Sequence, residues 1–383
     1  MDLALNDDQR AVRAAVREWV AEVVTPHALR NDREERFPQE ALDGLRQTGF
    51  VGLTIPEEYG GGGADPLTYC VFIEELSYGD ANVRSIMSVH LALVAGSVER
   101  WGTEEQKQRW LSVMATGEVI GCFGLTEPDA GSNPGDLRAT AKPLTGGGWL
   151  LDGRKVFITN GSIAGVALVM ARTGGPGGKG VSAFLVPTDT DGFSAVPLHG
   201  KLGLRSCDTA ELVLDGVEVG PGALLGPEGA GLKVALSALD DGRMSVAASA
   251  TGISAAAVDV MVAYAGARTQ FGKPIAAHQL VQELIADAAV ELDASRLMTW
   301  AVADLKTRGE PYSVAASKAK LFATEASVRA ANSCIQVHGG YGYVEDYPAA
   351  KMLRDARVTT LYEGTSQIQK LLIGRALTGI SAF

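Results

Sequence analysis

The sequence predicts a mainly α-helical protein with a central β domain, from three observations. Apolar residues recur at three- and four-residue intervals up to about residue 120 and again from about residue 229, which is typical of helices. Between these stretches the chain carries short strand-like runs separated by glycine-rich turns. At 383 residues it is also too long for one ordinary core. We therefore expect a helical domain over residues 1–120, a β domain over 121–228 and a second helical domain over 229–383.

The first helix is predicted by a cap and by a stripe of apolar residues. Asn6 and Gln9 have the spacing of a capping box, a variant in which two side chains satisfy free backbone N–H groups. The spacing of the apolar residues places them on one helical face. The stripe consists of Val12, Val16, Trp19, Val20 and Val23.

The middle segment is predicted to form strands joined by tight turns. Its runs are WLLDGRKVFIT, GVSAFLVP and TAELVLDGVEV. Gly175, Gly177 and Gly180 match the spacing of a dinucleotide-binding loop, but such a loop needs a helix directly after it, and here a strand-like run follows. A P-loop is excluded because Gly180 stands where Ser or Thr must bind magnesium. We interpret the glycines as a hairpin turn.

The last third is predicted to be helical. Long Ala-rich stretches surround a second apolar stripe, and no internal repeat of solenoid length is present. The uncharged stretch 244–258 is shorter than the roughly 20 residues that a membrane-spanning helix needs. The stripe consists of Val281, Leu284, Ile285, Ala288 and Leu292.

Composition and charge exclude several classes of function. The net charge of -11 argues against nucleic acid, because phosphate contacts need a basic face. The four cysteines show no C-x-x-C spacing, so neither a metal site nor a disulfide framework is indicated. The N-terminus MDLALNDDQR lacks the basic and apolar regions of a signal peptide. We expect a cytoplasmic protein without a membrane or metal.

One acidic residue, Glu363 in LYEGTSQIQ, is a candidate general base. Ser366 and Gln369 have capping-box spacing, so a helix should begin near Ser366, just after Glu363. Apolar neighbours would raise the pKa of Glu363, which suits a base working near neutral pH. The alternative is a carboxylate that only complements the helix dipole.

Three further clusters could bind a ligand, although each is weak alone. FGLTEPDAGSNPGD offers hydroxyls and backbone N–H groups in a bent loop, and an ordinary polar turn is the alternative. In RTQFGKPIAAHQ, Arg268 and Gln270 precede Phe271, and His278 and Gln279 follow. QVHGGYG contains paired glycines that permit close approach to a ligand.

Taken together and in order, eight segments resemble the acyl-CoA dehydrogenases over essentially the whole chain. The resemblance implies an N-terminal helical domain, a middle β-barrel or sandwich and a C-terminal four-helix bundle, assembled as a homotetramer. The segments are GCFGLTEPDAGSNPGD, DGRKVFITNG, KLGLRSCDTAELVLDGVEV, LDDGR, RTQFGKPI, QVHGGYGYVEDYP, LRDAR and LYEGTSQIQ.

The resemblance also implies non-covalently bound FAD. Matching positions would line the flavin, would contact FAD across a subunit boundary, or would bind its adenine side. Phe157, where the family often has Trp, and Asn133, often Asp, are departures. The first group is Phe123, Leu125, Thr126, Ser132, Phe157 and Thr159, with Thr365 and Gln367; the second is Arg268, Gln270, Phe271, His278 and Gln279; the third is Gln336, Gly339 and Gly340.

By the same resemblance, Glu363 matches the catalytic base of an α,β-dehydrogenation. It would remove the α-proton of an acyl thioester while the β-hydrogen leaves as hydride to flavin N5. One branch of the family places its base two positions after the first Asp of LDDGR, which here is Gly242 and cannot serve. The substrate positions implied are Ser132, Asp240, Asp241, Gly242, Arg243 and Gly364. Arg243 could equally form a structural ion pair.

The substrate and the electron acceptor are less sharply indicated. Most motifs resemble the short-chain branch, whereas Arg84 and Ser85 in NVRSIMSVH resemble the pair that holds a distal carboxylate in glutaryl-CoA dehydrogenases. An exposed helix arginine is the alternative for Arg84. The resemblance implies an electron-transferring flavoprotein as acceptor. It leaves open an acyl-carrier-protein thioester as substrate, and disfavours a flavin monooxygenase because Glu363 is present.

Overall fold

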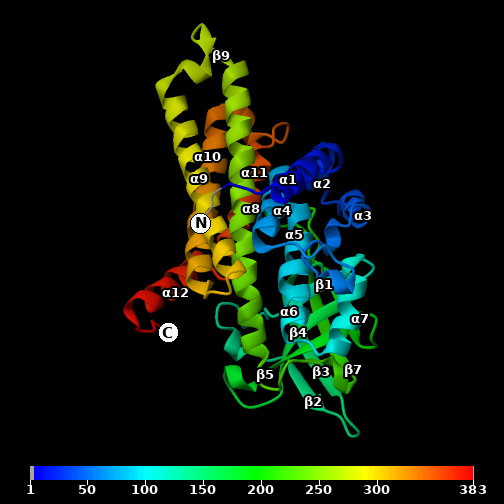
Figure 1. Ribbon diagram of the computed structural model, residues 1–383. Coiled ribbons are helices and arrows are strands. Elements are labelled where there is room, and N and C mark those ends of the chain that lie inside the picture. The colour runs from blue at the N-terminus through cyan, green and yellow to red at the C-terminus, as the bar shows by residue number, and fades with distance from the viewer. Residues whose placement is uncertain (1–3, 383) are drawn as a thin grey trace.

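The computed structural model describes residues 4–382 and has helices at both ends of the chain with a sheet between them (Figure 1). The predicted capping box is confirmed: Asn6 Oδ1 accepts from the Gln9 N–H at 2.8 Å, and Gln9 Oε1 accepts from the Asn6 N–H at 3.0 Å. In the predicted stripe, Val16 and Val20 are buried in the main core. The helices are α1 (Asp7–Trp19), α2 (Thr25–Glu34), α3 (Gln39–Gln47), α4 (Pro66–Gly79), α5 (Ala81–Met87), α6 (Gly96–Trp101) and α7 (Glu104–Ala115), with π-helical turns at Val20–Val24 and Ser88–Ala95.

The β region is one eight-stranded sheet in the order β6-β7-β3-β2-β4-β5-β8, with β1 paired in parallel to β4. All three predicted strand-like runs are strands, and the glycine-rich segment 173–180 is the turn between antiparallel β4 and β5, so the hairpin interpretation is confirmed. The strands are β1 (Gly121–Gly124), β2 (Thr140–Pro143), β3 (Trp149–Thr159), β4 (Val166–Arg172), β5 (Val181–Pro187), β6 (Phe193–Pro197), β7 (Thr209–Val219) and β8 (Leu224–Leu225).

The sheet buries both faces at β4 and β5. Alternate residues of β4 belong to two cores: Leu168 packs with the helices, whereas Val169 packs with β3 and β7. Trp149 of β3 also contacts Phe184 of β5 at 5.4 Å between ring centroids, although these strands are not neighbours in the sheet. The sheet therefore curls over a core of its own while its other face rests on the helical domain.

Long helices form the last third (Figure 1). α8, α9 and α10 pack against one another, and α11 and α12 pack against α10, so the predicted fold class is confirmed. The stripe on α9 packs into the bundle core, with Ala288 buried. The division of the chain at residues 120 and 228 stays a prediction. The elements are α8 (Gly231–Ala267), β9 (Thr269–Gln270), β10 (Lys273–Pro274), α9 (Gln279–Thr307), α10 (Ser313–His338), α11 (Ala349–Thr359) and α12 (Ser366–Thr378).

Two helical stretches in the described residues, Ala81–Trp101 and Gly231–Ala267, are long and apolar enough to cross a membrane by length and composition. The uncharged stretch 244–258 is thus part of a longer helix than its own limits indicate. In the most apolar 18-residue part of each stretch, 94% and 67% of the residues, respectively, are buried inside the protein. Packing in the core accounts for this composition, because core helices have the same character.

Candidate active site

Glu363 lies in a tight bend between α11 and α12. Its φ is 53°, and that of Gly364 is 92°, so two successive residues are left-handed. The predicted cap at Ser366 is wrong by one residue. Thr365 caps α12 by accepting from the Ile368 N–H at 3.2 Å, whereas the Ser366 hydroxyl donates to Glu325 at 2.6 Å.

The carboxylate of Glu363 lies against Gly242 on α8. Its Oε2 is buried and has no hydrogen-bond partner. Burial raises the pKa of Glu363 to about 7, against the opposing effect of the cations Arg84, Lys320 and Arg243. The predicted direction of the pKa shift is therefore confirmed. A Cβ atom at Gly242 would overlap Glu363 Oε2, so a glycine on α8 makes room for the carboxylate.

Arg84 lies beside this carboxylate. It is 1% exposed, so the alternative of an exposed helix arginine is wrong. Its Nη2 donates to the Tyr362 hydroxyl at 2.5 Å, while its Nε is buried without a hydrogen-bond partner. The neighbouring Ser85 donates to Ala81 O within its own helix. Arg84 thus brings a buried positive charge with an unpartnered donor close to Glu363.

A buried ionic network fixes α5, which carries Arg84, relative to α11, which leads to Glu363. Lys351 Nζ donates to Asp80 at 2.8 Å and to Asp355 at 2.6 Å. Asp80 caps α5 through the Asn82 N–H, and Asp355 accepts from the Leu204 N–H at 2.7 Å. Sequence reasoning missed this network, although the spacing of Lys351 and Asp355 on one helix was a signal.

The LDDGR segment is held by ion pairs within the chain. Arg243 Nη1 donates to Asp240 at 2.6 Å, so the structural ion pair that was one interpretation of Arg243 is present. Asp241 accepts from Lys306 at 2.7 Å and from Tyr312 at 2.6 Å. These contacts anchor the two acidic side chains and leave Gly242 between them facing Glu363.

The strand-side candidates lie on β1, β3 and the loop between β1 and β2. Phe123 and Leu125 are buried, and Ser132 is exposed in the loop. Phe157 has φ 60° where β3 changes register against β7, and its side chain is 72% exposed. Such bulges commonly re-aim a side chain. Here an aromatic ring projects from the sheet beside partly buried Thr159.

A second buried pair, also missed from the sequence, holds the loop after β1. Lys155 Nζ donates to Glu127 at 2.7 Å and to Leu125 O at 3.3 Å. Glu127 in turn accepts from the N–H groups of Arg138 and Ala139 at 2.6 and 2.9 Å. The pair therefore fixes both ends of the loop that contains Thr126.

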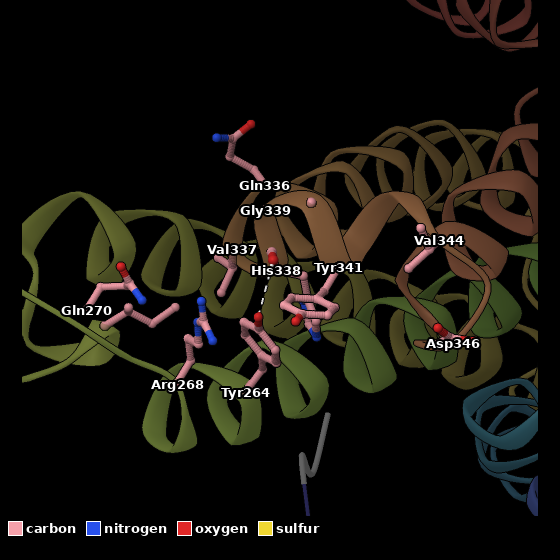
Figure 2. A pocket seen from close by; sticks show the side chains of 12 residues that line it. Tyr264, Arg268, Gln270, Gln336, Val337, His338, Gly339, Tyr341, Val344 and Asp346 are labelled. Atoms are coloured by element: carbon pink, nitrogen blue, oxygen red, sulfur yellow. Dashed lines mark hydrogen bonds between the residues drawn. The ribbon is translucent and has the colours of Figure 1, made fainter.

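A separate open groove of about 610 Å³ lies between the C-terminal ends of α8 and α10 (Figure 2). Five predicted positions line it together: Arg268, Gln270, Gln336, Gly339 and Gly340. Its floor includes Tyr264 stacked on His338, with ring centroids 4.0 Å apart. In Figure 2 the Gln336 side chain points away from Tyr264 and Arg268.

The other positions predicted near this end lie on the β9–β10 hairpin and the start of α9. Phe271 is 92% exposed at the hairpin tip, 5.9 Å from the ring of His278. His278 Nε2 is buried without a partner, and Gln279 begins α9. Of the two α12 positions, Thr365 is the cap, and Gln367 is exposed.

The bend and the groove lie far apart in one chain. Gly242 lies within α8, and Arg268 is the residue that follows the last residue of this helix. At a rise of 1.5 Å per residue the two are roughly 39 Å apart. Figure 1 shows the same separation, with β9 at one end of the molecule and the sheet at the other. The predicted contacts therefore form two separate sets.

Comparisons with known proteins agree on one family. Three family models match: the N-terminal, middle and C-terminal domains of acyl-CoA dehydrogenase, at residues 6–118, 122–217 and 229–378. The chain is 41% identical to an acyl-CoA dehydrogenase of Bacillus subtilis (98% of this chain, 99% of the relative) and 40% identical to the short-chain specific acyl-CoA dehydrogenase of Clostridium acetobutylicum (97% and 98%).

Solved structures agree. Butyryl-CoA dehydrogenase of Megasphaera elsdenii matches with TM-score 0.96 and 36% identity over 98% of this chain and 100% of that one. Glutaryl-CoA dehydrogenase of Mycobacterium smegmatis matches with TM-score 0.93 and 36% identity (99% and 97%). A chain solved in work on the electron-transferring flavoprotein of Acidaminococcus fermentans matches with TM-score 0.97 and 39% identity, over 99% of this chain and 100% of that one. The chain belongs to the acyl-CoA dehydrogenase family, whose members are FAD-dependent oxidoreductases acting on the CH–CH bond of acyl-CoA thioesters.

Proposed function

We propose that this acyl-CoA dehydrogenase acts on a short acyl chain and that Glu363 removes the α-proton. The observation that carries the proposal is the buried, unpartnered Glu363 Oε2 together with a pKa of about 7. A general base is most effective when its pKa lies near the working pH, because it is then both available and basic. The product would be the trans-2-enoyl thioester. The names of the relatives support the short chain.

The residues around Glu363 divide the work. FAD, when bound, takes up the hydride that leaves the β-carbon. Burial makes the Glu363 carboxylate basic, while Arg84, Lys320 and Arg243 keep the pKa from rising further. Burial of Glu363 Oε2 also keeps water from that oxygen, which strengthens its interactions with nearby charges.

The described residues fit a flavin dinucleotide. Phe157 presents an exposed ring next to a loop rich in backbone donors, which suits an aromatic ring system. At the other end, added Cβ atoms at Gly339 and Gly340 would meet nothing within 4 Å, so the groove can admit a ligand close to its backbone. Arg268 could contact its phosphates.

We also propose that a complete FAD site needs two chains, as in a homotetramer. Gly242, which faces Glu363, and Arg268 in the groove are roughly 39 Å apart along α8, so one FAD whose flavin lies beside Glu363 should not reach the groove of the same chain. Mixing Glu363→Gln with Arg268→Ala chains tests this. At an FAD concentration too low to fill sites with a substituted groove, neither variant alone should bleach, whereas random assembly should give about a quarter of the sites both an intact base and an intact groove, because one partner supplies the base and the other the groove. No restoration would contradict shared sites.

The central experiment measures anaerobic loss of flavin absorbance on adding butyryl-CoA. Glu363→Gln should retain FAD and bind the thioester but bleach about 1,000-fold more slowly, the scale of a lost general base. Glu218→Gln, an exposed acid on β7, is the control. Bleaching by Glu363→Gln at the unmodified rate would refute the role of Glu363. The same assay compares CoA with acyl-carrier-protein thioesters and, for reoxidation, electron-transferring flavoprotein.

A substrate with a distal carboxylate is the second candidate. Arg84 is a buried cation with an unpaired Nε, and none of the ion pairs in residues 4–382 includes it. A forked guanidinium matches a carboxylate well. Arg84→Met should then lower turnover of glutaryl-CoA much more than that of butyryl-CoA. Equal losses would assign Arg84 to the electrostatics of Glu363 alone.

A further inference from the structure

The bend that presents Glu363 is held by two side chains from outside it. Lys320 Nζ, on α10, donates to the Gly364 carbonyl at 2.8 Å. Gln369 Nε2, on α12, donates to the same carbonyl at 3.0 Å and to the Glu363 carbonyl at 3.2 Å. Left-handed backbone at a residue with a side chain is strained and persists only where its surroundings impose it. These three hydrogen bonds impose it here.

Lys320 is an unusual way to hold a carbonyl. The side chain is fully buried, and none of the ion pairs in the part of the chain that the structure describes includes it. Burial lowers the pKa of its ammonium group to about 8, and Glu363 is the largest opposing influence, followed in the opposing sense by Glu325. A buried ammonium group without a carboxylate partner is costly, and an amide donor would serve the carbonyl more cheaply. The charge itself therefore needs an explanation.

Glu363 supplies that explanation, because it is surrounded by cations from three helices. Arg84 comes from α5, Lys320 from α10 and Arg243 from α8, and all three favour the ionised carboxylate. Arg84 is engaged by Tyr362 and Arg243 by Asp240. Lys320 alone is bonded to the peptide adjoining Glu363, so it can act on both the position of the base and its ionisation.

We propose that Lys320 is a positioning residue for the base, which fixes the Glu363–Gly364 bend through the Gly364 carbonyl and keeps a positive charge beside the Glu363 carboxylate. The inference rests on the proposed role of Glu363. Its two parts can be separated, because Gln369 holds the same bend without a charge. Loss of Gln369 should disturb position only, whereas loss of Lys320 should disturb position and ionisation together.

The test compares Lys320→Met, Gln369→Leu and Lys318→Met, an exposed lysine on the same helix, as holoenzymes. Lys320→Met removes a buried charge that has no carboxylate partner, and Gln369 still donates to the Gly364 carbonyl, so the variant should fold; Lys320→Gln is the second variant if it does not retain FAD. The readout is the rate of anaerobic bleaching by butyryl-CoA from pH 6 to 9.

Lys320→Met should bleach about 10- to 100-fold more slowly at pH 7, the scale of a misplaced catalytic group. The rising limb of its pH–rate profile should move to higher pH, because removing a cation makes the Glu363 carboxylate harder to ionise. Gln369→Leu should bleach more slowly without a shift of the pH–rate profile, and Lys318→Met should match the unmodified enzyme in both. A limb unmoved in the Lys320 variants overturns the proposal. The proposed function fails separately, through Glu363→Gln.

Discussion

The bend at Glu363 and the groove at Arg268 differ in how completely one chain builds them. The bend is enclosed: its carboxylate oxygen is buried, and three cations and a glycine come from α5, α8 and α10. The groove is open, with Arg268 and Gln270 exposed and two glycines facing free space. The surroundings of the proposed base are fixed within one chain, whereas the groove with the other predicted contacts is left unfilled.

This contrast teaches which residues are sensitive to small changes. In the bend, a shift of one atom alters a buried charge, because charges interact strongly away from water. In the groove, water and side chains can adjust, so single substitutions change binding energy by the value of one contact. The two regions should therefore respond to mutation by different amounts and through different measurable quantities.

Among substitutions that keep Glu363, the largest effect is expected from Gly242→Ala. The added Cβ would overlap Glu363 Oε2, so the carboxylate must move or the helix must shift. We expect bleaching by butyryl-CoA to slow about 100-fold, the cost of misplacing a reacting group by roughly an ångström. FAD content should stay unchanged, because the groove is remote. Gly266→Ala, near the other end of α8 with open space around it, is the control.

The stability of the fold should show the cost of enclosing Glu363. Its pKa is raised to about 7 from an ordinary value of 4.5, so the folded state favours the protonated carboxyl. Stability is then undiminished below about pH 4.5, falls as the pH rises through 7, and is lowest above it. Glu363→Gln removes this penalty and should be about 3 kcal/mol more stable at pH 8 and much less so at pH 5, measured by urea unfolding.

An Arg268→Ala substitution should affect the open region alone. Losing one charged contact in the groove should weaken FAD binding about tenfold, measured by titration of the apoprotein. Bleaching by the fraction that retains FAD should proceed at the unmodified rate. A slower rate in that fraction would show that the groove and the bend are coupled. Arg329→Ala, an exposed arginine paired with Glu291 on α9, is the matched control.

The sequence predicts these two regions unequally. The strands, the capping box at Asn6 and the raised pKa of Glu363 follow from local patterns, because alternation, side-chain spacing and apolar neighbours act over a few residues. The cap of α12 was misplaced because Thr365 and Ser366 are both good caps and only the packing of Ser366 against Glu325 decides between them.

Burial of charge could not be predicted. Arg84, Lys320 and Lys351 look like ordinary surface residues in a helix pattern, yet all three are buried. Their partners, Tyr362, the Gly364 carbonyl and Asp80, lie between 44 and 278 positions away along the chain. Such pairs depend on how helices from different domains pack, and no local period records that.

The smallest effect is expected from Phe157→Trp, which probes the strand side of the proposed flavin site. The ring at this position is 72% exposed and already adopts positive φ, so a larger ring meets little steric resistance. If the ring stacks on FAD, extra aromatic area should tighten FAD binding about two- to fivefold, the value of a modest aromatic contact. The rate of bleaching should not change, because Glu363 is untouched. An unaltered dissociation constant would place Phe157 outside the flavin contact and leave the loop after β1 as the provider of that surface.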